Sequence, residues 1–242
     1  MQDSTFFPLR ERTNFAALDS GLLLWRANIL ILFCVFAIPI AFLTAIGALV
    51  PFEINDLVFY LVIWWLKPLF DRMALHIVSV SFFNKEAKGK TLLRGIRGSI
   101  MSGLAGDLLW RRFSIRRSAV MPLRVLEAHG GKKLLERKKA LEAGGLNFGL
   151  FLTVFCFILE CMLYISDLVF YAVFNQMLNL SLLIKAESKL LFWIEYLPYI
   201  INYIFVETLY VSAGFALYIN SRVIVEGWDL QIAFKKAASN EE

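Results

Sequence analysis

The sequence predicts an all-α, polytopic membrane protein with about four transmembrane helices, short interfacial helices and a basic cytoplasmic insert. Hydrophobic residues make up 59% of the 242 residues, whereas soluble domains hold about 45–50%. The mean hydropathy is +0.64. Four largely apolar segments are longer than the roughly 20 residues that a helix needs to cross a bilayer. We expect them to form one membrane domain that covers residues 1–242.

An amphipathic helix is expected ahead of the first membrane span. Thr13 or Asn14 can cap such a helix, and Phe15, Leu18 and Leu22 recur at helical spacing after it. A helix with one apolar face at this place is typical of a segment that lies in the membrane interface.

Four spans are expected, at residues 27–50, 57–83, 147–174 and 196–218. Pro68 lies inside the second span and lacks an amide hydrogen, so it should kink that helix or split it into two halves. Residues 177–184, between the third and fourth spans, are largely apolar. They should lie on the membrane surface or form a re-entrant or longer helix.

The segment 84–145, between the second and third spans, is strongly basic. It holds 15 Lys and Arg residues and 5 Asp and Glu residues, a net charge of +10, whereas the whole chain carries +5. Lys and Arg near the ends of spans mark the cytoplasmic side of a membrane. With four spans, the insert and both termini are therefore expected in the cytoplasm.

Ionisable residues near the middle of three spans are the candidate functional residues. Lys67, Asp71 and Arg72 interrupt the second span, and Glu160 and Glu207 lie near the midpoints of the third and fourth. Such charges cost about 2.5–3.5 kcal/mol each on insertion scales, so they should face protein or water and find partners. Lys67 and Asp71 are four residues apart and share a helix face. Glu160 and Glu207 are the natural partners for Arg72, which would make a nearly neutral network.

Three roles are open for this charge network. An interhelical ion-pair lock that fixes packing is the first, and we favour it. A polar site for an ion, a proton or a lipid headgroup is the second, and catalysis is the third. Glu160 and Asp167 are seven residues apart and could face one groove, although Asp167 is more simply placed at the outer interface.

No motif in the sequence supports catalysis or a bound cofactor. The two histidines form no His-Glu-x-x-His pair, and there is no Gly-x-Ser-x-Gly, no Walker loop and no dinucleotide fingerprint. The three cysteines lie inside hydrophobic segments without metal-binding spacing. We therefore expect no metal, no cofactor and no enzymatic activity.

Arginines alternate with apolar residues between residues 108 and 126 of the insert. Beside membrane spans this pattern favours anionic headgroups of the inner leaflet, to which each basic residue contributes about 1 kcal/mol. A protein partner is the second interpretation, and nucleic acid is not expected. The arginines assigned to this docking surface are Arg111, Arg112, Arg116, Arg117 and Arg124.

The last part of the chain holds small residues and an interfacial tryptophan. The small residues should let the fourth span approach another helix closely; they are Ser212, Ala213, Gly214 and Ala216. Trp228 is typical of an anchor at the membrane interface. Upstream, residues 132–141 should form a short charged helix that stops at Gly144 and Gly145.

Several blocks of the chain carry a family resemblance. They are Trp64-Trp65-Leu66-Lys67-Pro68-Leu69-Phe70-Asp71-Arg72, Arg117-Ser118, Met121-Pro122, Leu126-Glu127, residues 207–218, and Asn220, Arg222, Glu226-Gly227-Trp228-Asp229-Leu230 and Ala233-Phe234. With these blocks, which cover most of the chain, the sequence resembles a family of bacterial inner-membrane proteins that has no established activity. Between Ser118 and Glu127 it departs from the family pattern, in which an aromatic residue and a Trp or Gln are usual.

The resemblance implies a location in the bacterial inner membrane and an accessory role in an envelope assembly. Genes of such proteins neighbour those of a MoxR-type AAA ATPase, a von Willebrand A-type protein and a transglutaminase-like membrane protein. We therefore expect a non-enzymatic integral inner-membrane subunit or scaffold, in contact with anionic lipids and with ATPase or transglutaminase-like partners. The alternative is a small transporter or lipid-handling protein whose intramembrane charges form a polar site.

Overall fold

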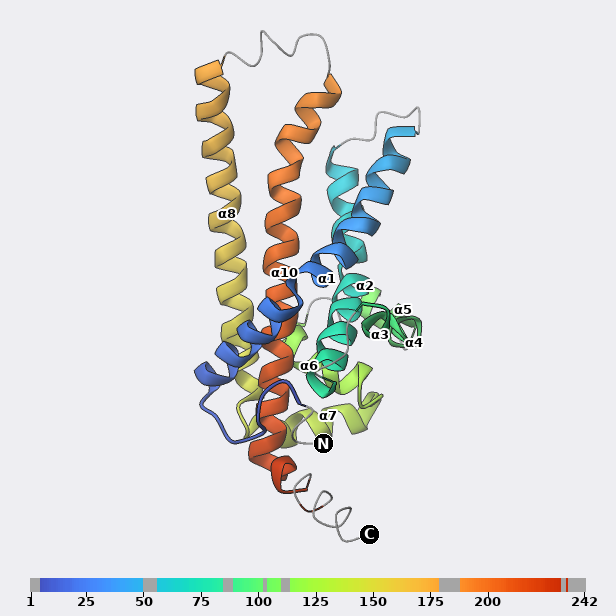
Figure 1. Cartoon of the computed structure of the whole chain (residues 1–242), viewed down its shortest axis with the longest axis vertical. Helices are drawn as coiled ribbons and strands as arrows, with labels where there is room; N and C mark the ends of the chain where they lie inside the picture. Colours follow the sequence, from blue (N-terminus) through green and yellow to red (C-terminus); the bar gives the residue numbers. More distant parts are fainter. Residues whose placement is uncertain are drawn as a thin grey trace.

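The computed structural model of the chain describes residues 5–49, 56–84, 89–101, 104–109, 114–178, 188–231 and 234, and among these residues it contains helices and loops but no strand. The long helices are α1 (Asn14–Leu49), α2 (Asp56–Phe83), α8 (Gly149–Leu178) and α10 (Ser188–Glu226). They run alternately up and down, so that the start of α1, the end of α10 and the insert lie at the same end of the bundle (Figure 1).

Three helices in the described part of the chain are long and apolar enough to cross a membrane. They contain the stretches Asn14–Leu43, Leu146–Phe174 and Leu197–Glu226. The all-α class and three of the expected spans are thereby confirmed in length and composition. The helix α2 differs because Lys67, Asp71 and Arg72 lie in its middle.

The expected break between an interfacial helix and the first span is wrong. The helix α1 runs without interruption from Asn14 to Leu49, about 54 Å at 1.5 Å per residue. The predicted cap is correct, because the backbone N–H of Ala16 donates to the hydroxyl of Thr13 at 3.3 Å. An amphipathic start therefore continues directly into the apolar part of the helix. Pro68 likewise lies within a single α2 and does not split it.

The insert is folded and packs against the bundle. Its helices are α3 (Lys90–Leu93), α4 (Ile96–Met101), α5 (Leu104–Leu109), α6 (Arg117–Val125) and α7 (Gly131–Glu142), followed by the short 3-10 helix η3 (Leu146–Phe148). The helices α3, α4 and α5 surround the second half of α2, and α6 packs between α2, α8 and α10 (Figure 1). The predicted stop of α7 is confirmed, since Gly145 follows it with a φ of +97°, which favours glycine.

The helix α10 is the centre of the molecule, and α1 crosses it at very short distance. A Cβ atom on Gly21 would lie 2.7 Å from the Cα of Ala213, which only glycine permits. Near this crossing, the indole N–H of Trp25 donates to the buried hydroxyl of Thr208 at 2.9 Å. The prediction that small residues near Ala213 allow close helix contact is confirmed.

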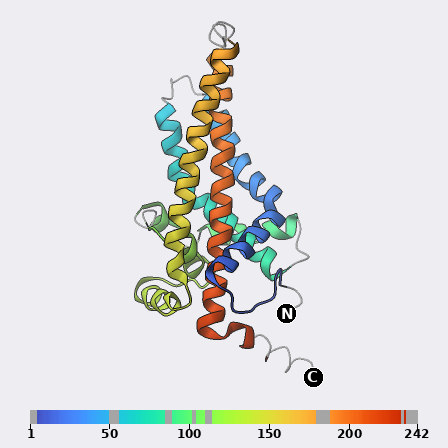
Figure 2. The same cartoon turned by 90° about the vertical axis from the view of Figure 1, so that its left-hand side faces the viewer.

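Burial differs sharply between the last two long helices. In its most apolar stretch, 72% of the residues of α10 are buried inside the molecule, whereas for α8 the share is 17%. The two helices lie side by side in both views and reach further from the insert than α1 and α2 (Figures 1 and 2). The helix α8 thus turns a long apolar face away from the protein, as expected for contact with lipid.

Candidate functional site

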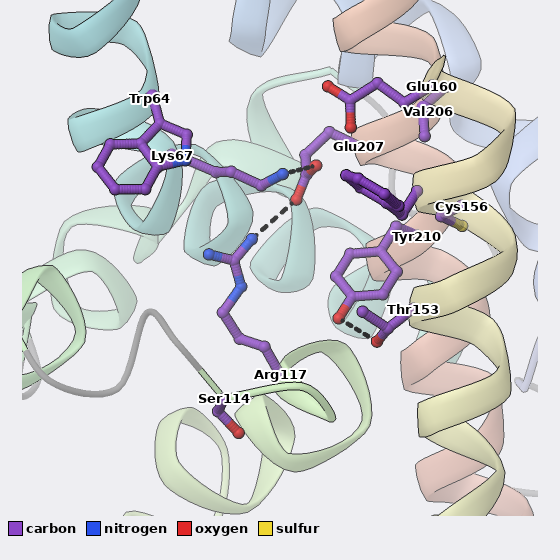
Figure 3. A pocket seen from close by; sticks show the side chains of 11 residues that line it. Trp64, Lys67, Ser114, Arg117, Thr153, Cys156, Glu160, Val206, Glu207 and Tyr210 are labelled. Carbon is purple, nitrogen blue, oxygen red and sulfur yellow. Dashed lines mark hydrogen bonds and ion pairs between the residues drawn. The ribbon is translucent and has the colours of Figure 1, made fainter. Parts of the chain in front are cut away.

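A cluster of ion pairs joins three helices at the middle of the molecule. The guanidinium of Arg117, from the first turn of α6, lies 2.7 Å from Asp71 on α2 and 3.0 Å from Glu207 on α10. The ammonium of Lys67 on α2 lies 2.5 Å from the other oxygen of Glu207. Figure 3 shows Lys67 and Arg117 converging on Glu207 from two sides. We call these four residues the central cluster.

The central cluster is largely buried, and its most exposed side chain, that of Lys67, is 19% exposed. The side chains of Asp71 and Glu207 are 1% and 3% exposed, and that of Arg117 is 11% exposed. Burial lowers the pKa of Arg117, but the carboxylates of Asp71 and Glu207 outweigh burial and raise it above its ordinary value. Arg117 is therefore a permanent cation, and it compensates the buried charge of Asp71 and shares Glu207 with Lys67.

Arg72 belongs to a second cluster, in which its partner differs from the expected one. Its guanidinium donates to Asp107 of α5 at 2.6 and 3.1 Å, and Arg124 of α6 pairs with the other oxygen of Asp107. Arg72 therefore binds neither Glu160 nor Glu207 among the described residues. The physical reason is that Arg72 follows Asp71 directly and projects from a different face of α2, toward the insert.

A third cluster lies at the end of α10 and fixes α7. Arg137 lies 2.7 Å from Glu127 and also pairs with Glu226, and the hydroxyl of Tyr218 donates to Glu127 at 2.7 Å. Arg222 lies 2.9 Å from Glu226. Partial burial raises the pKa of Glu127, but the hydrogen bonds from Arg137 and Tyr218 outweigh it, so this pKa lies below its ordinary value.

The predicted docking arginines do not share one surface. Arg117 and Arg124 are buried and bound to carboxylates inside the molecule, and Arg116 lies 2.7 Å from Glu142. Arg111 and Arg112 lie outside the described residues. For Arg117 and Arg124 the docking role is therefore wrong: α6 lies inside the molecule and its cations satisfy buried carboxylates.

Two cavities that share four lining residues adjoin the central cluster. The smaller, about 180 Å³, is lined by Lys67, Arg117, Glu160 and Glu207 together with hydroxyl and apolar groups (Figure 3). The larger, about 670 Å³, shares Lys67 and Glu160 with the first and is otherwise mainly aromatic and apolar. The structure thus brings Glu160 to the central cluster without giving it an ion pair among the described residues.

The other two predicted positions have partners within the protein. Asp167 accepts a hydrogen bond of 2.7 Å from the side-chain amide of Asn202 on α10, so it ties α8 to α10. The ring of Trp228 lies 4.1 Å below the guanidinium of Arg222 and meets the edge of Phe83. Trp228 therefore anchors the end of α10 to α2, and its place at a membrane interface stays a prediction.

Asp107 and the core role of Arg117 were missed from sequence. One signal was present: Asp107 is among only five acidic residues in a segment with 15 basic ones, so several cations compete for it. No sequence period indicates that Arg117 belongs with Asp71 and Glu207, because it reaches them through the folding of α6.

Comparison with protein-family models, with curated proteins and with solved structures finds no match to this chain. Within the described residues no group of three or more His, Cys, Asp or Glu side chains is placed to hold a metal ion.

Proposed function

We propose that the protein is a non-enzymatic integral subunit or scaffold of the bacterial inner membrane, with four spans, a cytoplasmic insert and cytoplasmic termini. The single observation that carries this proposal is the attachment of the insert to the bundle by three buried or half-buried ionic clusters. Asp107, Arg117 and Glu127 each bind side chains of α2 or α10. Such a multiply fixed insert suits a rigid platform better than a mobile lid.

The surface that the platform offers to a partner consists of exposed basic residues. They are Lys90, Arg94, Arg97, Lys132, Lys133 and Lys139. Lys132, Lys133 and Lys139 are exposed residues of α7, and this helix lies at the outer edge of the molecule in Figure 2. Positive groups at the cytoplasmic end of a bundle attract anionic lipid headgroups and acidic protein surfaces.

A pull-down from native bacterial membranes in mild detergent tests the proposal. We expect the tagged wild-type chain to recover a stoichiometric ATPase or transglutaminase-like membrane protein, identified by mass spectrometry. Replacing Lys132, Lys133 and Lys139 together by glutamine should lower this recovery, and Glu136→Gln, a neighbouring exposed residue of opposite charge, should leave it unchanged. A wild-type chain that carries lipid but no protein would contradict the subunit role and favour the lipid-handling alternative.

The orientation is tested separately with a single engineered cysteine. Lys133→Cys, in a chain without its three native cysteines, should resist a membrane-impermeant maleimide in intact spheroplasts and react after permeabilisation. Reaction in intact spheroplasts would place the insert outside the cytoplasm and contradict the proposed topology.

A further inference from the structure

The larger cavity has an aromatic wall that comes from three helices. Its aromatic lining residues are Trp64 of α2, Phe157 and Tyr164 of α8, and Tyr199 and Tyr203 of α10. Several aromatic faces around one space form the surroundings in which a cation is attracted by ring quadrupoles. The ammonium of Lys67 already lies 5.6 Å from the ring centre of Tyr203, so the protein itself uses this attraction at the edge of the cavity.

If every side chain is counted as ionised, the residues around the two cavities carry one net negative charge. Lys67 and Arg117 provide two positive charges, and both are engaged by Asp71 and Glu207 at 3.0 Å or less. Glu160 is the third carboxylate and lines both cavities. Among the described residues no hydrogen bond and no ion pair to its carboxylate is formed, and the residue is only half-buried. A carboxylate at the midpoint of an apolar helix needs a compensating positive charge or proton.

The hydroxyl of Tyr203 gives an independent indication of a ligand. Tyr203 is 5% exposed and lines the larger cavity, and its hydroxyl has no hydrogen-bond partner among the described residues. A buried hydroxyl without a partner costs free energy, and a ligand with N–H groups would satisfy it. The cavity therefore offers one counter-ion and an aromatic wall, and the unpartnered hydroxyl is buried within that wall.

We propose that this cavity binds an amphiphilic organic cation, with its positive head between the aromatic rings and Glu160 and its apolar body along α2 and α8. An anionic ligand fits poorly, because both cations of the central cluster are already bound to carboxylates and Glu160 repels it. The same cationic group has two sources, the ammonium of a zwitterionic phosphatidylethanolamine headgroup or a free hydrophobic amine. The proposal goes beyond the scaffold role and requires no protein partner.

Equilibrium binding of two ions of matched shape and opposite charge tests the proposal. The full-length protein is purified in dodecyl maltoside, a neutral detergent, and titrated with tetraphenylphosphonium or with tetraphenylborate. We expect saturable binding of the phosphonium only. The Glu160→Gln variant keeps the side-chain size and removes the charge, so its affinity for the phosphonium should fall about tenfold or more.

The matched control is Asp167→Asn, which removes one carboxylate from the same helix outside the cavity. The new amide can still accept the hydrogen bond of Asn202, and affinity should stay within about twofold of wild type. Tyr164→Leu, at a 47% exposed position of the cavity wall, provides a second variant whose fold is secure, and it should also weaken binding. Equal binding by wild type and Glu160→Gln, or equal binding of both ions, would overturn the proposal.

The source of the cation is distinguished by adding lipid. If phosphatidylethanolamine displaces the phosphonium and stays bound in native mass spectrometry, the site takes a lipid headgroup. If it does not displace the phosphonium, the lipid headgroup is excluded and a free amine is the remaining source. Both results support a cation site, and neither depends on whether a protein partner is found in the pull-down.

Discussion

Arg117 is the residue whose loss should cost most, because it faces two buried carboxylates at once. Among the described residues, Arg117→Gln would leave Lys67 as the one cation paired with this group of carboxylates. We expect a loss of about 3–5 kcal/mol in the free energy of unfolding, the range for one partner removed from a buried ion pair. Thermal and denaturant unfolding in detergent, followed by tryptophan fluorescence, measures this loss.

The neighbouring arginine is the matched control. Arg116 is 30% exposed and pairs with Glu142 near the surface, so Arg116→Gln should cost at most about 1 kcal/mol. Comparable losses for the two variants would mean that the central cluster does not hold the fold together. Adding Asp71→Asn to Arg117→Gln should recover part of the stability, because one uncompensated charge is removed.

Glu127 makes the attachment of α7 sensitive to acid. Its pKa is lower in the folded protein than in the unfolded chain, so its carboxylate stabilises the fold above the unfolded pKa, and this stabilisation is lost as the pH falls through the folded pKa. We expect α7 to loosen between about pH 5 and pH 3. Hydrogen exchange of α7 amides, corrected for intrinsic rates, should rise in this window.

The Glu127→Gln variant checks the assignment of this acid sensitivity. It should exchange faster than wild type at neutral pH and lose most of the change on acidification. Glu136→Gln, which alters an exposed acid of the same helix, should keep the wild-type pH profile. If Glu127→Gln shows the same pH profile as wild type, another group causes the acid sensitivity.

Among the helices, the crossing of α1 and α10 depends on one glycine. A Cβ at position 21 would meet backbone atoms of α10, Ala213 Cα at 2.7 Å and Ser212 O at 3.0 Å, and backbone yields poorly. Gly21→Ala should therefore destabilise the protein by about 1–3 kcal/mol. The unfolding midpoint of the purified variant measures the loss.

Gly98 in α4 is the control for the intrinsic effect of alanine. In the described part of the chain, no atom beyond the backbone of the same helix lies within 4 Å of a Cβ there, and alanine is the better helix former by about 1 kcal/mol or slightly less. Gly98→Ala should leave stability unchanged or raise it. If Gly21→Ala behaves in the same way, α1 and α10 are further apart than the structure has them.

For helix α6, the role that the sequence predicts for two arginines is wrong. Alternating arginines and apolar residues next to a membrane predict a headgroup-binding surface, and the pattern is compatible with that role. The arginines Arg117 and Arg124 bind Asp71 and Asp107, which are 46 and 17 positions away in the chain. The residues next to an arginine do not show whether it binds a lipid headgroup or pairs with a carboxylate far away in the chain. Arginine suits both roles.

For the whole molecule, the unequal burial of α8 and α10 predicts unequal access to lipid. A photoreactive apolar diazirine dissolved in the bilayer should label α8 heavily, at residues such as Ile158, Met162 and Phe170, which are 48%, 64% and 65% exposed. Labelling of α10 should be several-fold weaker. Equal labelling would mean that α10 is less central, and weak labelling of α8 would mean that another protein covers it.

The broad architecture followed from composition, because hydropathy and capping residues act over short stretches. Thr13, Gly145 and the apolar runs of α1, α8 and α10 are of this kind. The pairing of Lys67 with Glu207 was within reach, because two opposite charges in apolar helices have few other partners. The folding of the insert could not be predicted from the sequence. It depends on which of the many basic residues forms an ion pair with each of the few acidic ones.

The position of Glu207 late in the chain has a consequence for biosynthesis. Arg117 precedes its partner Glu207 by 90 residues, so translation leaves it without that carboxylate for on the order of ten seconds. The hydrogen bonds of the Arg12 backbone form later still. Their partner Asn220, which binds both the N–H and the C=O of Arg12, follows 208 residues later in the chain. Helix α10, made long after the first segment, thus completes the bonds of that segment. A chain cut short before α10 exposes unmatched charges and open backbone groups, by which membrane quality-control proteases can recognise it as unfinished.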